Sequence, residues 1–208
     1  MIPGLDFIGL PMMYAITFFA LFNGLYIMCI LLENRNGFKS PKEGRVYTLS
    51  AIVPVYNGAK HLKECVESLQ GLNYPKGKVE IIVVDDGSKD NSYETAKKMK
   101  GVRAYRIRHA GKSAAVNFGI ERAKGELIGI LDVDSSVSPD ALRRMTGFFS
   151  DKKVGAVHSG MRVKNKGNFI EKFQELEYMF ALLFKKIFST IDGLYVTPGV
   201  FSVYRKSL

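Results

Sequence analysis

Three groups of side chains in this sequence have the types and spacing that bind phosphates and divalent cations. They are the pair Asp85 and Asp86, the pair Asp132 and Asp134, and Lys112, which follows a glycine. Carboxylate oxygens are ligands that Mg²⁺ and Mn²⁺ accept, and Mg²⁺ usually completes its shell with waters and substrate phosphates. A lysine at a helix start can meet a phosphate with its ammonium, while backbone N–H groups contribute from the same turn.

Each group also has a plainer interpretation. The acidic pairs could be solvated turns that cap helices, and Lys112 could be an ordinary surface lysine. The chain carries 30 Lys+Arg against 20 Asp+Glu, a net charge of +10, so its solubility does not require clustered acids. Like charges this close repel each other unless a cation joins them. Asp132 and Asp134 are two residues apart, and in an extended segment both carboxylates face the same way, so we expect them to hold Mg²⁺ or Mn²⁺.

The segments around these groups alternate between strand and helix patterns. We expect strands at residues 47–55, 79–84, 102–107, 126–131 and 154–158, and helices at 58–70, 90–100, 112–124 and from 138 onward. This alternation predicts an α/β fold, a mostly parallel sheet with right-handed crossovers and helices on both faces. Ligands of such sheets lie outside the carboxyl ends of the strands. Both acidic pairs, and the residues from Tyr56 to Gly58 after the first strand, fall at those ends.

The amino-terminal part of the chain has a different composition. Residues 7–32 form 26 consecutive positions without a charge, and a helix of that length is about 39 Å long, enough to span a bilayer. A cleaved signal peptide fits less well, since there is no basic region before the run and no small-x-small site after it. Only Asp6 precedes the run, whereas basic side chains follow it, at Arg35, Lys39, Lys42 and Arg45. The positive-inside rule then places the rest of the chain in the cytoplasm.

Two cysteines cannot form a disulfide scaffold, which agrees with a reducing compartment. We therefore divide the chain into a transmembrane anchor (1–33), a polar linker (34–46) and one α/β domain (47–208), at the cell membrane with the domain in the cytoplasm. Nucleic acid is not expected as a partner, because the basic excess is explained by the cytoplasmic face of a membrane and no aromatic-basic interleaving occurs.

Three stretches of the domain resemble the family 2 glycosyltransferases, with their GT-A nucleotide-sugar-binding fold: AIVPVYNGAKHLKECVESL, EIIVVDDGSKDNS and GKSAAVNFGIERAKGELIGILDVDSS. The resemblance covers about residues 48–208, in the family's order and spacing. It implies a pocket for the nucleotide base and ribose, formed by Pro54, Val55, Tyr56, Asp85 and Asp86. It further implies that Lys112 touches the diphosphate. Asp132 and Asp134 match the family's DxD motif, whose carboxylates hold the divalent metal and the sugar-diphosphate.

The last segment, VTPGVFSVYRKSL, resembles the acceptor-site loop and following strand of the membrane-bound, chain-extending members, such as hyaluronan, chitin and poly-N-acetylglucosamine synthases. This likeness implies acceptor-side residues at Thr197, Pro198 and Gly199. The implied reaction is inverting transfer of a sugar from a nucleotide-diphosphate sugar, with a UDP-sugar favoured, to a hydroxyl of a glycan or lipid. Among the residues of this chain, Asp134 is the expected catalytic one.

Those members carry a downstream acidic motif that supplies the general base, and this sequence stops before it. We therefore expect a fragment of a longer enzyme and assign no general base. The nearest acids of the acceptor half are Glu175, Glu177 and Asp192, which we expect to be structural. The alternative is a catalytically incomplete membrane module that binds nucleotide sugars.

Two further points stay open at this stage. DVDSS is superficially similar to the aspartate motif of haloacid-dehalogenase phosphohydrolases, although that motif ends the first strand of its fold and this one follows the fourth expected strand. Residues 168–190 form a helix with a broad apolar face, which could pack in the core or rest at a membrane interface. The three histidines, His61, His109 and His158, are not spaced as metal ligands and receive no role.

Overall fold

The computed structural model describes residues 5–34, 41, 44–164, 167–191, 193 and 200–207. The chain forms two compact units. One comprises Met1–Lys39 and Arg162–Tyr195, and the other comprises Ser40–Met161 and Val196–Leu208. The second unit contains a six-stranded sheet, and it carries all of the site residues that the structure describes.

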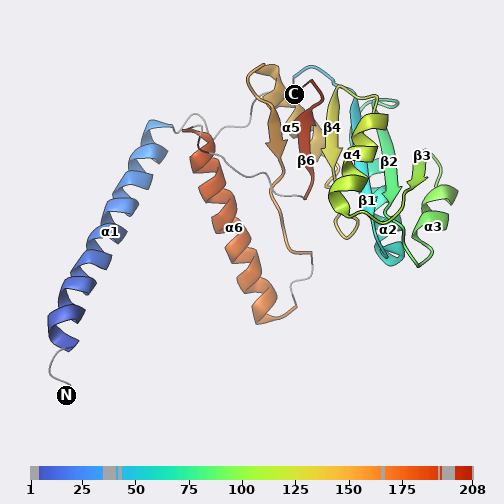
Figure 1. Cartoon of the computed structure of the whole chain (residues 1–208). Helices are drawn as coiled ribbons and strands as arrows, with labels where there is room; N and C mark the ends of the chain where they lie inside the picture. Colours follow the sequence, from blue (N-terminus) through green and yellow to red (C-terminus); the bar gives the residue numbers. More distant parts are fainter. Residues whose placement is uncertain are drawn as a thin grey trace. The chain divides into compact units, whose positions relative to one another are not determined.

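The sheet unit alternates strands and helices, as the sequence predicts (Figure 1). Its strands are β1 (Leu49–Val55), β2 (Val79–Asp85), β3 (Val102–Arg106), β4 (Leu127–Ile130), β5 (Ala156–His158) and β6 (Ser202–Arg205). Its helices are α2 (Ala59–Gln70), α3 (Ser92–Lys98), α4 (Lys112–Arg122), α5 (Ala141–Thr146) and the 3₁₀ turn η1 (Gly147–Ser150). The predicted bounds are therefore right to within three residues for the five expected strands, β1 to β5, and for the first three helices of this unit. Helix α5 begins three residues after the predicted opening and is short.

The order of the strands is β3-β2-β1-β4-β6-β5. The first four are parallel, and β6 pairs antiparallel with both β4 and β5. The predicted fold class, an α/β mostly parallel sheet with helices on both faces, is confirmed. One detail differs from a fully parallel arrangement: the expected fifth strand does not extend the parallel set, because β6 lies between it and β4 and runs the other way.

Apolar side chains cover both faces of the sheet. Leu49, Ala51, Val53 and Val55 of β1 belong to a buried cluster with α2, α3 and α5, whereas Ile52 belongs to a second cluster with α4. A strand with both faces buried needs apolar residues at every position, which explains the continuous apolar runs in the sequence. The predicted buried face of α2 is also confirmed, with Leu62, Cys65, Val66 and Leu69 all buried.

The other unit contains two long helices, α1 (Leu5–Glu33) and α6 (Phe169–Ser189). Within the described part of the chain, the stretch Gly9–Glu33 is long and apolar enough to cross a membrane, with a mean hydropathy of 2.2. Its side chains are almost all exposed in the isolated chain. An N-terminal apolar helix that could serve as an anchor is therefore present.

Helix α6 begins with a capping box. The Asn168 side chain accepts the N–H of Glu171, and the Glu171 carboxylate accepts the N–H of Asn168. Its apolar face is not packed into a core: only Ile187 of this helix is buried, while Phe169 and Phe173 are 81% and 62% exposed. The sequence allowed this helix either to pack in the core or to rest at a membrane interface. Among the described residues, its apolar face does not pack in a core.

Candidate functional site

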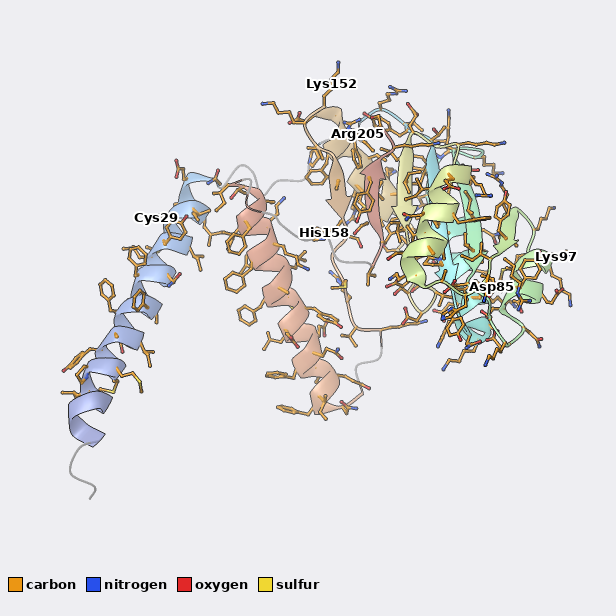
Figure 2. All side chains as sticks on the ribbon, viewed as in Figure 1. Cys29, Asp85, Lys97, Lys152, His158 and Arg205 are labelled. Carbon is orange, nitrogen blue, oxygen red and sulfur yellow. The ribbon has the colours of Figure 1, made fainter. Side chains whose placement is uncertain are left out.

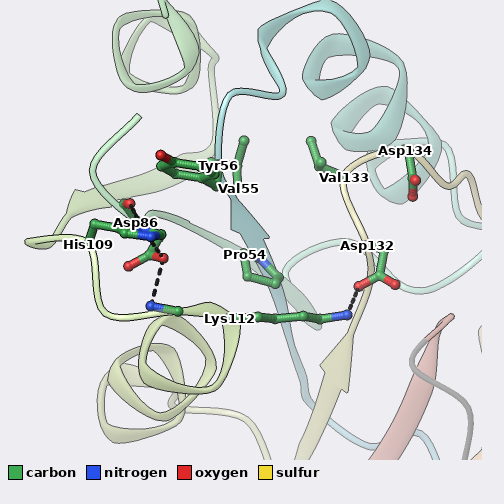
Figure 3. A pocket seen from close by; sticks show the side chains of 10 residues that line it. Pro54, Val55, Tyr56, Asp86, His109, Lys112, Asp132, Val133 and Asp134 are labelled. Carbon is green, nitrogen blue, oxygen red and sulfur yellow. Dashed lines mark hydrogen bonds and ion pairs between the residues drawn. The ribbon is translucent and has the colours of Figure 1, made fainter. Parts of the chain in front are cut away.

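A pocket of about 370 Å³ opens at the carboxyl edge of the parallel strands (Figure 3). It receives residues from the ends of β1, β2 and β4 and from the segment between β3 and α4. The residues that line it are Pro54, Val55, Tyr56, Asp86, His109, Gly111, Lys112, Asp132, Val133 and Asp134. Seven of the residues singled out from the sequence are thus brought to one place by four separate stretches of chain.

Asp86 lies on the β2 side of this pocket and is only 3% exposed. Its carboxylate accepts backbone N–H groups from Ala110 at 2.8 Å and from Gly111 at 2.9 Å. His109 also approaches it, with Nδ1 at 2.8 Å from Oδ2. Asp86 therefore holds the turn that leads into α4, and it satisfies two amides that would otherwise be available to a phosphate at this helix start.

The turn after β2 requires the glycine that follows Asp86. Gly87 has φ of 72°, a conformation that side chains disfavour. A Cβ atom added there would lie 2.9 Å from the backbone N of His109. The close approach of these two loops is what places His109 at the pocket.

Asp85 does not line the pocket, although it is next to Asp86. Its side chain is fully buried and one oxygen lies 3.1 Å from Nε of Arg106, while the other accepts the N–H of Ser88 at 3.3 Å. Successive side chains of a strand point to opposite sides, so two adjacent aspartates at a strand end cannot both face one ligand. Asp85 instead fixes the loop after β2, and Arg106 reinforces it by donating to the carbonyl of Ser88.

Lys112 is the first residue of α4, and Gly111 precedes it with φ of 93°. The Lys112 ammonium lies 2.5 Å from Oδ1 of Asp132, which follows β4. Figure 3 shows the lysine side chain extending past Pro54 to reach this carboxylate. Lysine and aspartate are both partly exposed, at 55% and 27% of their side-chain surfaces.

Residues 132–135 form a turn, with the N–H of Ser135 donating to the carbonyl of Asp132 at 3.0 Å. The expectation of an extended segment at this point is wrong, because that hydrogen bond closes the chain on itself. The two carboxylates nevertheless both line the pocket, on either side of Val133. Asp134 is exposed, and its described hydrogen-bond partner is the Ser135 hydroxyl at 3.3 Å.

Cys65 of α2 lies directly behind this turn. Its Sγ is 3.6 Å from the carbonyl oxygen of Asp132. Burial, followed by the negative charges of Asp134 and Asp132, raises the pKa of the Cys65 thiol to about 12. The thiol is therefore neutral and packs as an apolar group beneath the acidic turn.

His109 is a pocket residue for which the sequence predicted no role, and Gly111 and Val133 also line the pocket without having been predicted. Its ring stacks on Tyr56, with 4.4 Å between centroids and 23° between planes. Its Nδ1 is close to two acceptors of Asp86, the carboxylate at 2.8 Å and the carbonyl at 3.0 Å, so Nδ1 carries a hydrogen and donates. His109 lies between the third predicted strand and Lys112, so its position at a strand end is visible in the sequence, whereas its contacts with Tyr56 and Asp86 are not.

The charge of the pocket decides whether a metal fits it. Three carboxylates, of Asp86, Asp132 and Asp134, line the pocket together with one ammonium, that of Lys112, so the acids and the lysine sum to a formal charge of −2. Such a pocket repels a diphosphate unless another cation joins them. The described residues contain no cluster of three or more His, Cys, Asp or Glu that could enclose a metal. Two carboxylates with open positions suit a hard divalent ion that shares its shell with phosphates and water, so the donor set fits Mg²⁺ or Mn²⁺.

The predicted acceptor-side residues, Thr197, Pro198 and Gly199, lie outside the described residues, as does Asp192. Glu175 and Glu177 belong to α6, in the unit without the sheet.

Comparison with known proteins assigns the family. The sequence model of "Glycosyl transferase family 2" matches residues 50–208, so the chain belongs to this glycosyltransferase family. A curated relative, the poly-beta-1,6-N-acetyl-D-glucosamine synthase of Staphylococcus epidermidis, is 29% identical over 180 residues. That match covers 84% of this chain but 43% of the relative, so the chain spans less than half of the relative's length.

Solved structures agree with the fold. A mannosyltransferase from Pyrobaculum calidifontis in complex with GDP-Man and Mn²⁺ matches with a TM-score of 0.69 and 21% identity, over 92% of this chain and 55% of that one. TarS from S. aureus in complex with UDP-GlcNAc matches with a TM-score of 0.55 and 22% identity, over 77% of this chain and 46% of that one. At these identities the likeness shows a GT-A fold, and the ligands are those of the two neighbours.

Proposed function

We propose that this chain is the donor-binding part of a membrane-anchored, inverting glycosyltransferase. It would transfer a sugar from a nucleotide-diphosphate sugar to a hydroxyl of a growing glycan or a lipid, with help from a divalent metal. Residues 1–33 would anchor it, residues 34–46 would link the anchor to the domain, and residues 47–208 would form the domain on the cytoplasmic side of the cell membrane.

The observation that carries this proposal is the pocket at the carboxyl edge of the sheet. There Asp132 and Asp134 lie opposite Asp86, with Lys112 between the two sides. This combination supplies what a nucleotide diphosphate needs: acidic ligands for a metal, a mobile ammonium for a phosphate, and a partly apolar wall at Pro54 and Val55 against which a base can lie.

The chemistry assigns distinct roles to these side chains. Breakage of the bond between sugar and diphosphate builds negative charge on the leaving group, and Lys112 is placed to neutralise part of it. Asp132 and Asp134 would hold the divalent ion, which when bound supplies Lewis-acid stabilisation of the same diphosphate. Asp86 keeps Ala110 and Gly111 in position, and thereby keeps the start of α4 aimed at the pocket.

The donor we favour is UDP-N-acetylglucosamine. Support comes from the curated relative, named as a synthase of an N-acetylglucosamine polymer, and from the structural neighbour that is in complex with UDP-GlcNAc. Tyr56 and His109 form a stacked pair at the side of the pocket next to Asp86. We assign this side to the base and the Asp132 side to the diphosphate.

A second candidate function is nucleotide-sugar binding without turnover. Inversion needs a general base on the face of the sugar opposite the leaving group. Among the described residues that line the pocket, the only acids are Asp86, Asp132 and Asp134, all of which are already engaged by the roles above. The base would then come from a part of the enzyme beyond this pocket.

Membrane association would involve both helices of the other unit. Helix α1 is the candidate span, and the exposed apolar face of α6 resembles that of an interfacial helix, with Lys185 and Lys186 near its end. Burial lowers the pKa of Lys186, which is consistent with a side chain that lies along apolar neighbours.

Calorimetry with UDP, GDP and CDP in the presence of Mn²⁺ tests the proposal. We expect UDP to bind the wild-type chain best, and Asp134→Ala to lose the metal-dependent binding. Lys124→Ala is the matched surface control, since Lys124 lies outside the pocket. The function is wrong if none of the three nucleotides shows metal-dependent binding. Turnover of UDP-GlcNAc with an added acceptor would separate the transferase from the binding module.

A further inference from the structure

The ion pair between Lys112 and Asp132 joins two groups that the proposed function uses for different ligands. Lys112 would contact the diphosphate, and Asp132 would contact the metal. In the structure they contact each other, 2.5 Å apart, and the lysine spans the pocket to do so (Figure 3). The ammonium therefore stands where a metal would bind Oδ1 of Asp132.

The partners of the other acids make this contact specific. Asp86 is held by backbone amides and by His109, so its charge is already accommodated. No basic side chain of the described residues pairs with Asp134, whose described partner is the Ser135 hydroxyl. Of the two proposed metal ligands, Asp132 alone has its charge balanced by a cation of the described residues.

We propose that Lys112 is an exchangeable cation, which neutralises Asp132 before the donor binds and moves to the diphosphate when it does. This inference rests on the proposed function and adds the order of events. The arriving diphosphate draws the ammonium away, and Asp132 then becomes free for the divalent ion. The lysine side chain is exposed and the aspartate side chain is partly exposed, so solvent weakens their mutual attraction and the exchange needs little energy.

A cooperative response follows from this exchange. Nucleotide binding releases Asp132, and metal binding to Asp132 releases Lys112, so each ligand favours the arrangement that the other needs. By linkage, nucleotide and metal then raise each other's affinity by the same factor. Part of that factor would arise from the chain itself, in addition to direct contact between the metal and the phosphates.

Binding of UDP without metal isolates the exchange from metal coordination. Affinities would be measured in EDTA, on the full 208-residue chain in detergent, for wild type, Asp132→Asn, Asp134→Asn, Lys112→Gln and the double variant Lys112→Gln/Asp132→Asn. Asp134→Asn is the matched control, because it removes the same charge from the same pocket without touching Lys112. Thermal unfolding of each variant would show that it is folded.

We expect Asp132→Asn to increase the affinity for UDP about twofold to fivefold more than Asp134→Asn does, the range that an exposed ion pair supports. This extra gain should vanish when Lys112 is also replaced, since it comes from freeing the ammonium. Equal gains in the two aspartate variants, or no gain in either, would overturn the proposal, as would an extra gain that persists in the double variant. A parallel titration of wild type with UDP and Mn²⁺ tests the proposed function separately. If wild type shows no metal-dependent binding of UDP, the proposed function is wrong. If it does and the variants behave as just described, only the exchange is wrong.

Discussion

The two ends of the central sheet both carry a hollow lined by charged side chains, yet they use those charges differently. The pocket at the carboxyl edge is acidic. The hollow at the amino edge has a volume of about 540 Å³ and is mainly basic, with a lining of Arg45, Tyr47, Lys124, Gly125, Glu126, Phe149, Ser150, Lys152, Arg205, Lys206 and Ser207. Figure 2 shows Arg205 and Lys152 at this end of the sheet and Asp85 toward the other.

At the amino edge, Arg205 and Lys206 are bound to the backbone of neighbouring segments. Arg205 donates to the carbonyls of Val154, Phe149 and Asp151, and Lys206 donates to the carbonyl of Ala123, at the end of α4. These bonds tie the last strand to the segments beside it. These two basic side chains of the hollow therefore serve to hold β6 in the fold.

At the carboxyl edge, two of the three acids have few partners. Asp86 is integrated into the loops, whereas Asp132 has one displaceable lysine and Asp134 has a neighbouring hydroxyl. A carboxylate that the fold does not use is available for a ligand. The comparison teaches that the partners of charged groups, more than the size of a hollow, distinguish a binding site from a structural contact.

The largest effect on stability is expected at the amino edge. Arg205→Ala removes the donor to three carbonyls and the cation that lies over Phe149, 5.2 Å from its ring centroid. We expect the free energy of unfolding to fall by about 2–3 kcal/mol, because those acceptors lose a charged partner. Urea unfolding would measure it. Lys152→Ala is the control and should change stability by less than about 0.5 kcal/mol. Equal losses of stability in Arg205→Ala and Lys152→Ala would contradict a structural role for the charge of Arg205 at the amino edge.

Asp86→Asn should have the next largest effect, since this acid is the structural one at the carboxyl edge. Its amide would place an N–H₂ group against one of the N–H donors of Ala110, Gly111 or His109. We expect a loss of about 1–2 kcal/mol in stability, together with weaker UDP binding because the start of α4 moves. Unfolding and calorimetry on the same sample would check both. Unchanged stability would show that Asp86 does not hold this turn.

Glu126 gives a smaller, pH-dependent effect at the amino edge. It accepts the N–H and hydroxyl of Thr48 and pairs with Arg45. The backbone hydrogen bond from Thr48, with the charge of Arg45 also contributing, lowers the pKa of this exposed carboxyl. A lowered pKa in the folded chain means stability that is present above the unfolded value, about 4.3, and lost as the pH falls through the folded value. As the pH falls below about 4.3, the Tm of Glu126→Gln should therefore decrease less than the Tm of wild type. The same acid slope in both proteins would contradict this.

The smallest effect on stability is expected for Asp134→Asn. The described partner of its side chain is one hydroxyl, so the free energy of unfolding should change by less than about 0.5 kcal/mol. Metal-dependent UDP binding should nevertheless be lost. Urea unfolding would measure the stability of the variant, and calorimetry on the same sample would measure its metal-dependent binding of UDP. A large loss of stability would place Asp134 with the structural acids.

The sequence predicted the fold well, because strand and helix patterns depend on local periodicity. The apolar runs that became β1, β2 and β4 are buried on both faces, and such runs are recognisable without any tertiary information. The antiparallel pairing of β6 was not predictable in this way, because its four residues, Ser202–Arg205, acquire their direction from β4 and β5.

The site was predicted less completely. Tyr56, Asp86, Lys112, Asp132 and Asp134 meet at one pocket because they follow strand ends or begin a helix, which the topology brings together. Which of two adjacent aspartates turns inward depends on the pleat, so Asp85 could not be separated from Asp86 in advance.

His109 was missed for a different reason. Its role comes from a close approach of two loops at Gly87 and from stacking on Tyr56. Neither contact leaves a mark in the spacing of residues.

The most direct measurement is the position of Mn²⁺ in crystals of this chain grown with UDP. An anomalous difference map identifies the metal independently of the nucleotide. We expect one peak bound by Asp132 and Asp134 and by oxygens of the diphosphate, with Lys112 moved onto the phosphates. A nucleotide bound elsewhere, or a metal that contacts neither aspartate, would contradict it.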